Sequence, residues 1–244
     1  LVVRRCDGIL TTTEGSSRYF TKAYPGFCPP VHTQWNGATR EEIRNNWNPE
    51  PPAFTGERLV VTYTGYFMGT QTPEHFLRGM KLFMERNPGR KVLFRMIGDP
   101  GAYAGLPGEL GMGDSVEFHG IVPYSEVFRW QRSSDLLLLM TPPMSGNELK
   151  NSSKTVECLL ARKPVLVVAP EGDMTGLIRR MNAGYVCGHD PGSICEALET
   201  AWREMTGGVF RVLPDRTALE GGEMDMEMQV RLTAQFFESL ARRS

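Results

Sequence analysis

Short runs of apolar residues alternate with amphipathic stretches along most of the chain. The runs are too short for typical globular helices, and several are rich in β-branched residues, a pattern that favours buried parallel strands. We therefore predict strands at residues 59–64, 92–97, 116–122, 136–140 and 165–169.

The stretches between these runs have apolar residues at helical spacing. After Pro73, a residue suited to the first turn of a helix, one face carries Phe76, Leu77, Met80 and Phe83. The predicted helices are residues 74–86, residues 126–132 with Ser125 as a cap, and residues 194–205 after Ser193. Strands and helices in this alternation predict an α/β fold with a doubly wound, Rossmann-like parallel sheet.

The first fifty residues show a different pattern. Strands are predicted at 8–13 and 31–35, a helix at 16–24, and a linker rich in proline and charge follows as far as Pro52. Two strands cannot form a core alone, so this part must pack either on the domain that follows or on one that precedes the chain.

The last residues predict a closing helix at 226–243 with a face that docks on the rest of the protein. The apolar residues assigned to that face are Val230, Leu232, Phe236, Phe237 and Leu240. The expected division is residues 1–57 as a remnant of another domain with its linker, 58–215 as the sheet domain, and 216–244 as the closing helix.

Charge and cysteine usage narrow the choice of function. The formal net charge is -1, from 27 Lys and Arg and 28 Asp and Glu, which argues against nucleic acid as a partner because duplex binding needs a basic face. The five cysteines are scattered without a CxxC pair, as expected for reduced thiols in a cytoplasmic protein.

Membrane association finds no support in the sequence. No stretch approaches the ~20 apolar residues of a membrane-spanning helix, and no basic amphipathic segment suggests binding to a membrane surface. The chain begins with Leu1, so upstream targeting is not judged from it.

Ligands of open α/β sheets bind beyond the carboxyl ends of the strands, and candidate residues follow several predicted strands. Gly65 and Tyr66 come directly after the first strand of the sheet, where glycine permits close approach of a phosphate or a simple tight turn. Residues 98–101, with the sequence GDPG, match no phosphate-binding motif and indicate a structural turn.

The most informative segment is NSSKTVECL, residues 151–159. Ser152 or Ser153 can cap a helix whose N-terminus attracts anions, and Lys154 and Glu157 share its first turn. The lysine could offset the charge of a diphosphate, and the carboxylate could accept hydrogen bonds from ribose hydroxyls. A capping box that ends at Glu157 explains the same spacing without a ligand.

No metal site is predicted. The histidines are dispersed without an HExxH pair, and no DxD motif is present that would hold a metal–diphosphate complex. His119 lies inside a predicted strand, where a structural role is the more common one.

The order of these segments resembles the C-terminal domain of GT-B-fold glycosyltransferases, particularly the large retaining family four. The matching segments are VTYTGYFMGTQTPEHFLRGM, KVLFRMIGDP, DSVEFHGIVPYSEVFRWQRSSDLLLLM and KTVECLLARKPVLVVAPEGDMTGLIRRMNAGYVCG. Upstream, CDGILTTTEGSSRYFTKAYPG and VHTQWNG resemble the last part of that family's N-terminal domain. The resemblance implies a donor-binding domain with a short remnant of the acceptor domain.

The resemblance also assigns roles to residues. Glu157 matches the ribose-binding glutamate, the second of the E-x7-E motif. Donor contacts are further implied for Gly65 and Tyr66 after the first strand, for Ser152, Ser153 and Thr155 at the diphosphate, and for His119, Ile121 and Val122 beside the nucleobase.

This chain departs from the family at three positions. The first glutamate of E-x7-E is replaced by Leu149, with Glu148 next to it, and the two usual diphosphate cations are replaced by Tyr66 and Gln71. Lys154 is the candidate substitute and the implied catalytic residue.

The function implied is transfer of a sugar from a nucleoside-diphosphate sugar, such as a UDP-sugar, to an acceptor in polysaccharide biosynthesis. Transfer would proceed with retention, and without a metal or another cofactor. The acceptor groups would come from the missing part of the N-terminal domain, so these residues alone are expected to bind donor without efficient turnover. Two alternatives remain: a non-catalytic nucleotide-binding or interaction module, and a nucleotide-sugar epimerase.

Overall fold

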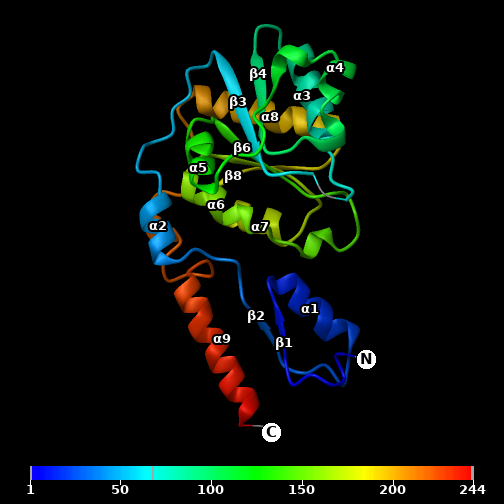
Figure 1. Cartoon of the computed structure of the whole chain (residues 1–244), viewed down its shortest axis with the longest axis vertical. Helices are drawn as coiled ribbons and strands as arrows, with labels where there is room; N and C mark the ends of the chain where they lie inside the picture. Colours follow the sequence, from blue (N-terminus) through cyan, green and yellow to red (C-terminus); the bar gives the residue numbers. More distant parts are fainter. Residues whose placement is uncertain (1, 68, 243–244) are drawn as a thin grey trace.

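The computed structural model describes residues 2–67 and 69–242, which form a parallel sheet covered by helices, a small N-terminal unit and a long C-terminal helix (Figure 1). The sheet has six strands in the order β5-β4-β3-β6-β7-β8. The strands are β1 (Ile9–Thr11), β2 (Val31–Thr33), β3 (Arg58–Thr64), β4 (Lys91–Ile97), β5 (Val116–Phe118), β6 (Leu136–Met140), β7 (Val165–Val168) and β8 (Gly184–Cys187). The helices are α1 (Glu14–Ala23), α2 (Arg40–Asn46), α3 (Glu74–Arg86), α4 (Leu106–Glu109), α5 (Tyr124–Arg132), α6 (Lys154–Ala161), α7 (Asp173–Arg180), α8 (Pro191–Thr206) and α9 (Met226–Ala241).

Both faces of the sheet are buried. Helices α3 and α8 cover one face, and α5, α6 and α7 cover the other (Figure 1). Along β6, Leu136 and Leu138 belong to the apolar core on the α3 side, whereas Leu137 and Leu139 belong to the core on the opposite side. Because successive side chains of a strand point to opposite faces, a strand buried on both sides must be apolar throughout.

The strands predicted for the sheet are confirmed for β3, β4, β6 and β7 to within one residue at each end. The predicted strand at 116–122 is wrong beyond Phe118. The chain turns at Gly120, which has a φ of +65° and forms an isolated antiparallel bridge with Gly98. Strand β8 was not predicted, because its four residues carry no clear alternation.

The helix α3 has the predicted bounds, whereas two other predicted starts are wrong. Helix α5 begins at Tyr124 after Pro123, so Ser125 lies inside the helix and does not cap it. Helix α8 begins at Pro191, and its cap is Asp190, whose carboxylate accepts a hydrogen bond from Ser193 N at 2.8 Å.

The predicted linker contains a helix. Helix α2 is closed by a capping box in which Thr39 and Glu42 bond reciprocally, and Ile43 packs into the core on the α6 side of the sheet. Seven residues with one buried side chain give too weak a periodicity to be recognised in the sequence. The predicted boundary at residue 57 stays a prediction, although α2 packs on the sheet domain.

The N-terminal unit consists of the parallel pair β1 and β2 with α1, and α9 lies against it (Figure 1). Phe236 of α9 stacks on His32 at 5.3 Å between ring centroids, and Thr233 Oγ1 donates to Gln34 Oε1 at 3.1 Å. The predicted closing helix therefore exists, with Arg243 outside the described residues.

The docking face of α9 agrees with the predicted one only at Phe236 and Leu240, which lie close to Gly8. Gln229 and Thr233 are buried, whereas Val230, Leu232 and Phe237 are exposed. Two polar side chains thus lie on the buried side, because they bond to the backbone or the side chains of the N-terminal unit.

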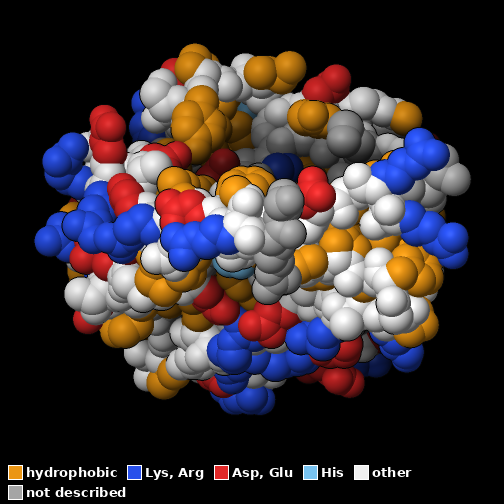
Figure 2. Space-filling model, turned by 90° about the horizontal axis from the view of Figure 1, so that it is seen from below, with side chains coloured by type: hydrophobic (Ala, Val, Ile, Leu, Met, Phe, Trp, Pro, Cys, Tyr) orange, Lys and Arg blue, Asp and Glu red, His pale blue; other side chains and the backbone are white. Residues whose placement is uncertain are grey.

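The end of the molecule formed by the N-terminal unit and α9 has a mixed surface (Figure 2). Basic side chains lie in several separate groups, and acidic side chains lie between them. This view shows no continuous basic face of the kind that binds a nucleic-acid backbone.

Candidate functional site

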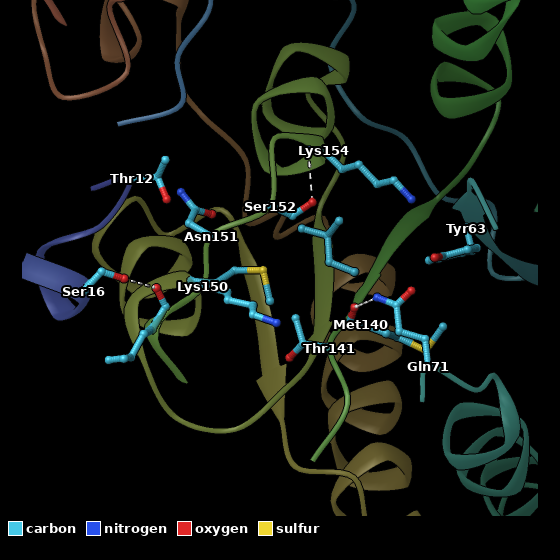
Figure 3. Close-up of a pocket in the computed structure, with 13 residues that line it drawn as sticks. Thr12, Ser16, Tyr63, Gln71, Met140, Thr141, Lys150, Asn151, Ser152 and Lys154 are labelled. Carbon is cyan, nitrogen blue, oxygen red and sulfur yellow. Dashed lines mark hydrogen bonds between the residues drawn. The ribbon is translucent and has the colours of Figure 1, made fainter. Parts of the chain in front are cut away.

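A cavity of about 340 Å³ lies beyond the carboxyl ends of β3 and β6, between the sheet domain and the N-terminal unit (Figure 3). It is formed by loops and helix ends from both parts of the chain. Its lining residues are Thr12, Ser16, Tyr63, Gln71, Leu139, Met140, Thr141, Leu149, Lys150, Asn151, Ser152, Lys154 and Met174.

Lys154, the first residue of α6, extends across the cavity toward β3 (Figure 3). Its ammonium lies 4.9 Å from the centroid of the Tyr63 ring, and it forms no ion pair with a described carboxylate. Burial lowers the pKa of Lys154, and the charge of Glu157 opposes this shift. A half-buried cation without a counterion is suited to an anionic ligand.

The loop after β3 brings backbone close to this ammonium. Gly65 has a φ of +125°, and a Cβ there would lie 2.1 Å from Lys154 Nζ. Gly65 N donates to Ile97 O at 2.8 Å, and a Cβ on Gly98 would lie 1.8 Å from Gly65 O. Both glycines are therefore required by close backbone packing, and the segment at 98–101 is a structural turn, as predicted.

Tyr63 supports the same loop. Its hydroxyl donates to Tyr66 O at 3.2 Å, and burial raises the pKa of Tyr63 to about 12, so the hydroxyl remains a donor at neutral pH. The side chain of Tyr66 itself is 58% exposed and does not line the cavity. The predicted role of Tyr66 in donor binding stays a prediction.

The N-terminus of α6 differs from the expected cap. Ser153 occupies the cap position but makes no capping hydrogen bond with its side chain, and the alternative of a capping box with Glu157 is not formed. Ser152 Oγ instead accepts from Lys154 N at 3.3 Å. The N–H of Thr155 donates to Ser152 O, whereas the N–H groups of Ser152 and Ser153 donate to no described residue and are left to bind an anion.

Glu157 lies one turn further along α6. It does not line the cavity, and its carboxylate accepts a hydrogen bond from Tyr124 OH at 3.5 Å. Burial raises the pKa of Glu157, and the charge of Lys154 opposes this shift. Glu157 is half-buried, and its ribose-binding role stays a prediction.

Two neighbouring polar residues connect α6 to the cavity. Thr155 is fully buried, and its hydroxyl donates to Asn151 Oδ1 at 3.0 Å. Asn151 is 7% exposed and lines the cavity, and its Nδ2 has no hydrogen-bond partner among the described residues. A buried N–H group without a partner is costly, so a ligand atom that accepts from it would be favoured. The sequence did not identify Asn151, although a polar residue between a strand and a helix N-terminus was a usable signal.

The N-terminal unit closes one side of the cavity. Thr13 Oγ1 donates to Leu149 O at 2.7 Å, and Ser16 Oγ donates to the same oxygen at 3.1 Å. Gly15 N donates to Asp173 Oδ2 at 3.0 Å. These contacts join positions more than 130 residues apart, which the sequence could not reveal.

The residues predicted beside a nucleobase lie after β5, outside the cavity lining. His119 Nε2 is 3.1 Å from Glu117 Oε2, and its ring lies 4.4 Å from that of Trp130. The hydrogen bond with His119 is the main cause of the lowered pKa of Glu117. Ile121 is 85% exposed and Val122 is half-buried, and their contacts with a base stay predictions.

The residues at the positions that depart from the family pattern make different contacts. Glu148 Oε2 accepts from Gly146 N at 2.7 Å, and Glu148 does not line the cavity. Gln71 Nε2 donates to Met140 O at 3.3 Å (Figure 3). A second lysine that the sequence did not identify, Lys150, lines the cavity with Lys154.

Within residues 2–67 and 69–242, no three His, Cys, Asp or Glu side chains are grouped so as to hold a metal ion. Metal independence remains a prediction. The same residues contain no helix with the length and apolar character needed to cross a membrane.

The chain matches known proteins in fold but not in sequence. No model of a known protein family matches the chain, and no curated protein sequence matches it. Solved structures do match. Sucrose-phosphate synthase from Thermosynechococcus elongatus is 14% identical with a TM-score of 0.66, over 100% of this chain and 60% of that one.

Two further structures were solved with ligands. HepE from Anabaena, in complex with UDP and glucose, is 16% identical with a TM-score of 0.69, over 98% of this chain and 65% of that one. The pneumococcal O-GlcNAc transferase GtfA, in complex with UDP and GlcNAc, is 12% identical with a TM-score of 0.63. The match covers 96% of this chain and 45% of GtfA.

These neighbours are GT-B glycosyltransferases, so the predicted fold class is confirmed. Identities this low show the fold alone, and membership of family four stays a prediction. The chain spans between about half and two thirds of the length of these three proteins.

Proposed function

We propose that this chain is the donor-binding part of a glycosyltransferase that takes its sugar from a nucleoside-diphosphate sugar. The observation that carries the proposal is Lys154, a half-buried ammonium beside Gly65 that forms no ion pair with a described carboxylate, in a cavity at the carboxyl edge of a parallel sheet. Ligands of open α/β sheets bind at this edge. Two fold neighbours, GtfA and HepE, were solved in complex with UDP, which supports a uridine nucleotide.

In the proposed reaction, Lys154 stabilises the charge that develops on the departing diphosphate. The unpaired N–H groups of Ser152 and Ser153 add partial positive charge at the start of α6. Donors that are already in place cost no reorganisation as the bond to the sugar breaks. Glu157 would bind the ribose hydroxyls, and the amide of Asn151 would donate to the sugar or to the diphosphate.

We further propose that transfer proceeds with retention. We also propose that it needs no metal, because Lys154 and the N-terminus of α6 supply the positive charge. The acceptor would be bound largely by a domain outside these residues, since 60% of sucrose-phosphate synthase and 45% of GtfA are matched. Residues 2–242 are then expected to bind donor without efficient turnover.

The test is calorimetric titration of the protein with UDP, GDP and ADP. One of the three nucleotides should bind. Lys154→Gln should weaken its binding at least about tenfold, the range for losing a charged hydrogen bond. Glu157→Gln should weaken its binding less. Lys91→Gln, a change of an exposed lysine at the start of β4, is the matched control. Equal binding by the Lys154 and Lys91 variants would contradict the proposal.

A specific observation favours one alternative, a non-catalytic nucleotide-binding module. Apart from Lys150 and Lys154, no described residue of the cavity lining is cationic, and Gln71 Nε2 donates to Met140 O. Sugar transfer that depends on the donor, measured with the full-length protein and a saccharide acceptor, distinguishes the two. The epimerase alternative predicts epimerised nucleotide sugar without any acceptor.

A further inference from the structure

The recess around Lys150 has a charge composition unlike that of the whole chain. Three cavities adjoin there through shared lining residues: the one of about 340 Å³, a small one beside His75 and His189, and an open one of about 540 Å³. Gln71 lines all three. Although the chain has 28 acidic residues, none of the described ones lines any of these cavities, and Lys150 and Lys154 are the only described Lys or Arg residues that do.

Lys150 has no counterion nearby. The closest carboxylate in the sequence, Glu148, accepts a hydrogen bond from Gly146 N and lines a different cavity beside Gly172. Lys150 lines both the cavity of about 340 Å³ and the open one, and it forms no ion pair with any carboxylate in the described part of the chain.

The backbone on both sides of Lys150 is held in place. Its own N–H donates to Asn147 O at 3.2 Å. The N-terminal unit and the segment that follows it supply three more bonds: Thr13 Oγ1 to Leu149 O at 2.7 Å, Ser16 Oγ to Leu149 O at 3.1 Å, and Asn36 Nδ2 to Asn151 O at 3.1 Å. A cation on a fixed backbone loses less conformational freedom when it binds an anion than one on a mobile loop.

The two lysines point to different places. In Figure 3, Lys154 extends toward Tyr63, whereas Lys150 extends toward Thr141. The hydroxyl of Thr141 is buried and has no hydrogen-bond partner among the described residues. A ligand with two separate anionic groups would satisfy both lysines, and the second group would also accept a hydrogen bond from Thr141.

We infer that Lys150 and Thr141 bind a carboxylate carried by the donor sugar, so that the donor is a nucleoside-diphosphate hexuronate. This inference rests on the proposed function, which places the diphosphate at Lys154. A neutral hexose would cover Lys150 and remove water from it while supplying only neutral hydroxyl acceptors, and such desolvation of a charge is unfavourable. A carboxylate supplies a charge-assisted hydrogen bond at the same place.

The test is calorimetric titration of the protein, Lys150→Gln and the control Lys91→Gln with UDP, UDP-glucose and UDP-glucuronate. UDP-glucuronate should bind roughly tenfold more tightly than UDP-glucose, the ratio expected for one charged hydrogen bond. Lys150→Gln should abolish this ratio and leave the affinity for UDP within about threefold, while Lys91→Gln should preserve it. Thr141→Val should reduce the ratio, since it removes only the hydroxyl.

Three outcomes overturn the inference. UDP-glucuronate and UDP-glucose bind equally well, the preference survives in Lys150→Gln, or free glucuronate binds the UDP complex through Lys150, which assigns the site to the acceptor. Failure of the proposed function looks different: UDP does not bind, or its binding is unchanged in Lys154→Gln. In that case the inference fails with it.

Discussion

The sheet domain and the N-terminal unit bury their side chains in different ways. In β6 and β7, consecutive residues pack into apolar cores on opposite faces. The strands β1 and β2 have three residues each, and the buried residues of this unit include Thr11 and Thr13. Its contacts with the sheet domain include polar bonds to Leu149 O and to the carboxylate of Asp173.

The cavity lies at the junction of these two regions, which is held together by hydrogen bonds. Apolar burial makes a sheet domain stable, whereas a few hydrogen bonds worth about 0.5–1.5 kcal/mol each can be made and broken. The cavity walls formed by Thr12 and Ser16 therefore depend on contacts that need little free energy to break. Lys154 and Tyr63 instead belong to the sheet domain, which is stabilised by apolar burial.

The largest expected effect is in the sheet core. Phe94 is fully buried, with its ring centroid 5.2 Å from that of Phe76. Phe94→Ala should lower the free energy of unfolding by about 3–5 kcal/mol, measured by urea denaturation. Val209→Ala, a change of a residue that is 55% exposed, is the control and should change it by less than about 0.5 kcal/mol. Similar losses in the two variants would contradict the description of the sheet core.

A smaller effect is expected at the junction. Asp173→Ala removes the acceptor of Gly15 N and the partner of Arg18, and an unsatisfied buried donor costs about 1–3 kcal/mol. The amides of α1 should exchange hydrogen faster, while those of β6 should not. Glu14→Gln is the control on the same helix, because it breaks an exposed pair with Arg18 worth about 0–1 kcal/mol. If exchange of α1 is unchanged by Asp173→Ala, the junction is held by other contacts.

The cavity should respond to pH through Lys154. Because burial lowers its pKa below the ordinary value of 10.5, the ammonium is lost at a lower pH than that of an exposed lysine. UDP affinity should therefore fall as pH rises through the lowered pKa. The free energy of unfolding should change in the opposite direction, since the unfolded chain binds more protons in that range and the fold gains stability as pH rises.

Lys154→Arg provides the matched comparison, because a guanidinium remains charged throughout this range. Calorimetry across alkaline pH should show a fall of a fewfold or more for the lysine protein and a nearly constant affinity for the arginine variant. Parallel profiles would mean that another group controls the response.

The smallest effect is expected on α9, where two adjacent aromatic residues differ in environment. Phe237 is 54% exposed, so Phe237→Ala should change the free energy of unfolding by less than about 0.5 kcal/mol. Phe236 stacks on His32 and approaches Gly8, so Phe236→Ala should cost more. Urea denaturation of the two variants tests this ranking, and equal losses would place the docking face of α9 on the wrong side.

The sequence predicted most of the sheet domain because its strands are apolar throughout and its helices are amphipathic. It missed α2, whose only buried residue is Ile43, and it extended β5 past the turn at Gly120, because neither feature changes the local hydrophobic pattern. The face assigned to α9 was right for Phe236 and Leu240, which lie close to Gly8, and wrong for the three exposed residues Val230, Leu232 and Phe237. Gln229 and Thr233 are buried through hydrogen bonds that a count of apolar residues does not detect.

The candidate site was predicted where it depends on local sequence. Gly65 and Lys154 follow from the end of a strand and the start of a helix, and the structure brings them together. Lys150 was not identified, because its role depends on contacts between loops such as that of Thr13 with Leu149, separated by 136 positions. Glu157 was expected to share a ligand with Lys154, yet the two side chains leave α6 in different directions, toward Tyr124 and Tyr63.

The most direct test of the central claim is a crystal structure of the protein with UDP. We predict the diphosphate between Lys154 Nζ, the Gly65 backbone and the N–H groups of Ser152 and Ser153, with phosphate oxygens within about 3 Å of the ammonium, the usual length of a charge-assisted bond. A diphosphate bound elsewhere, for example in the cavity lined by Ser193 and Arg211, would contradict it.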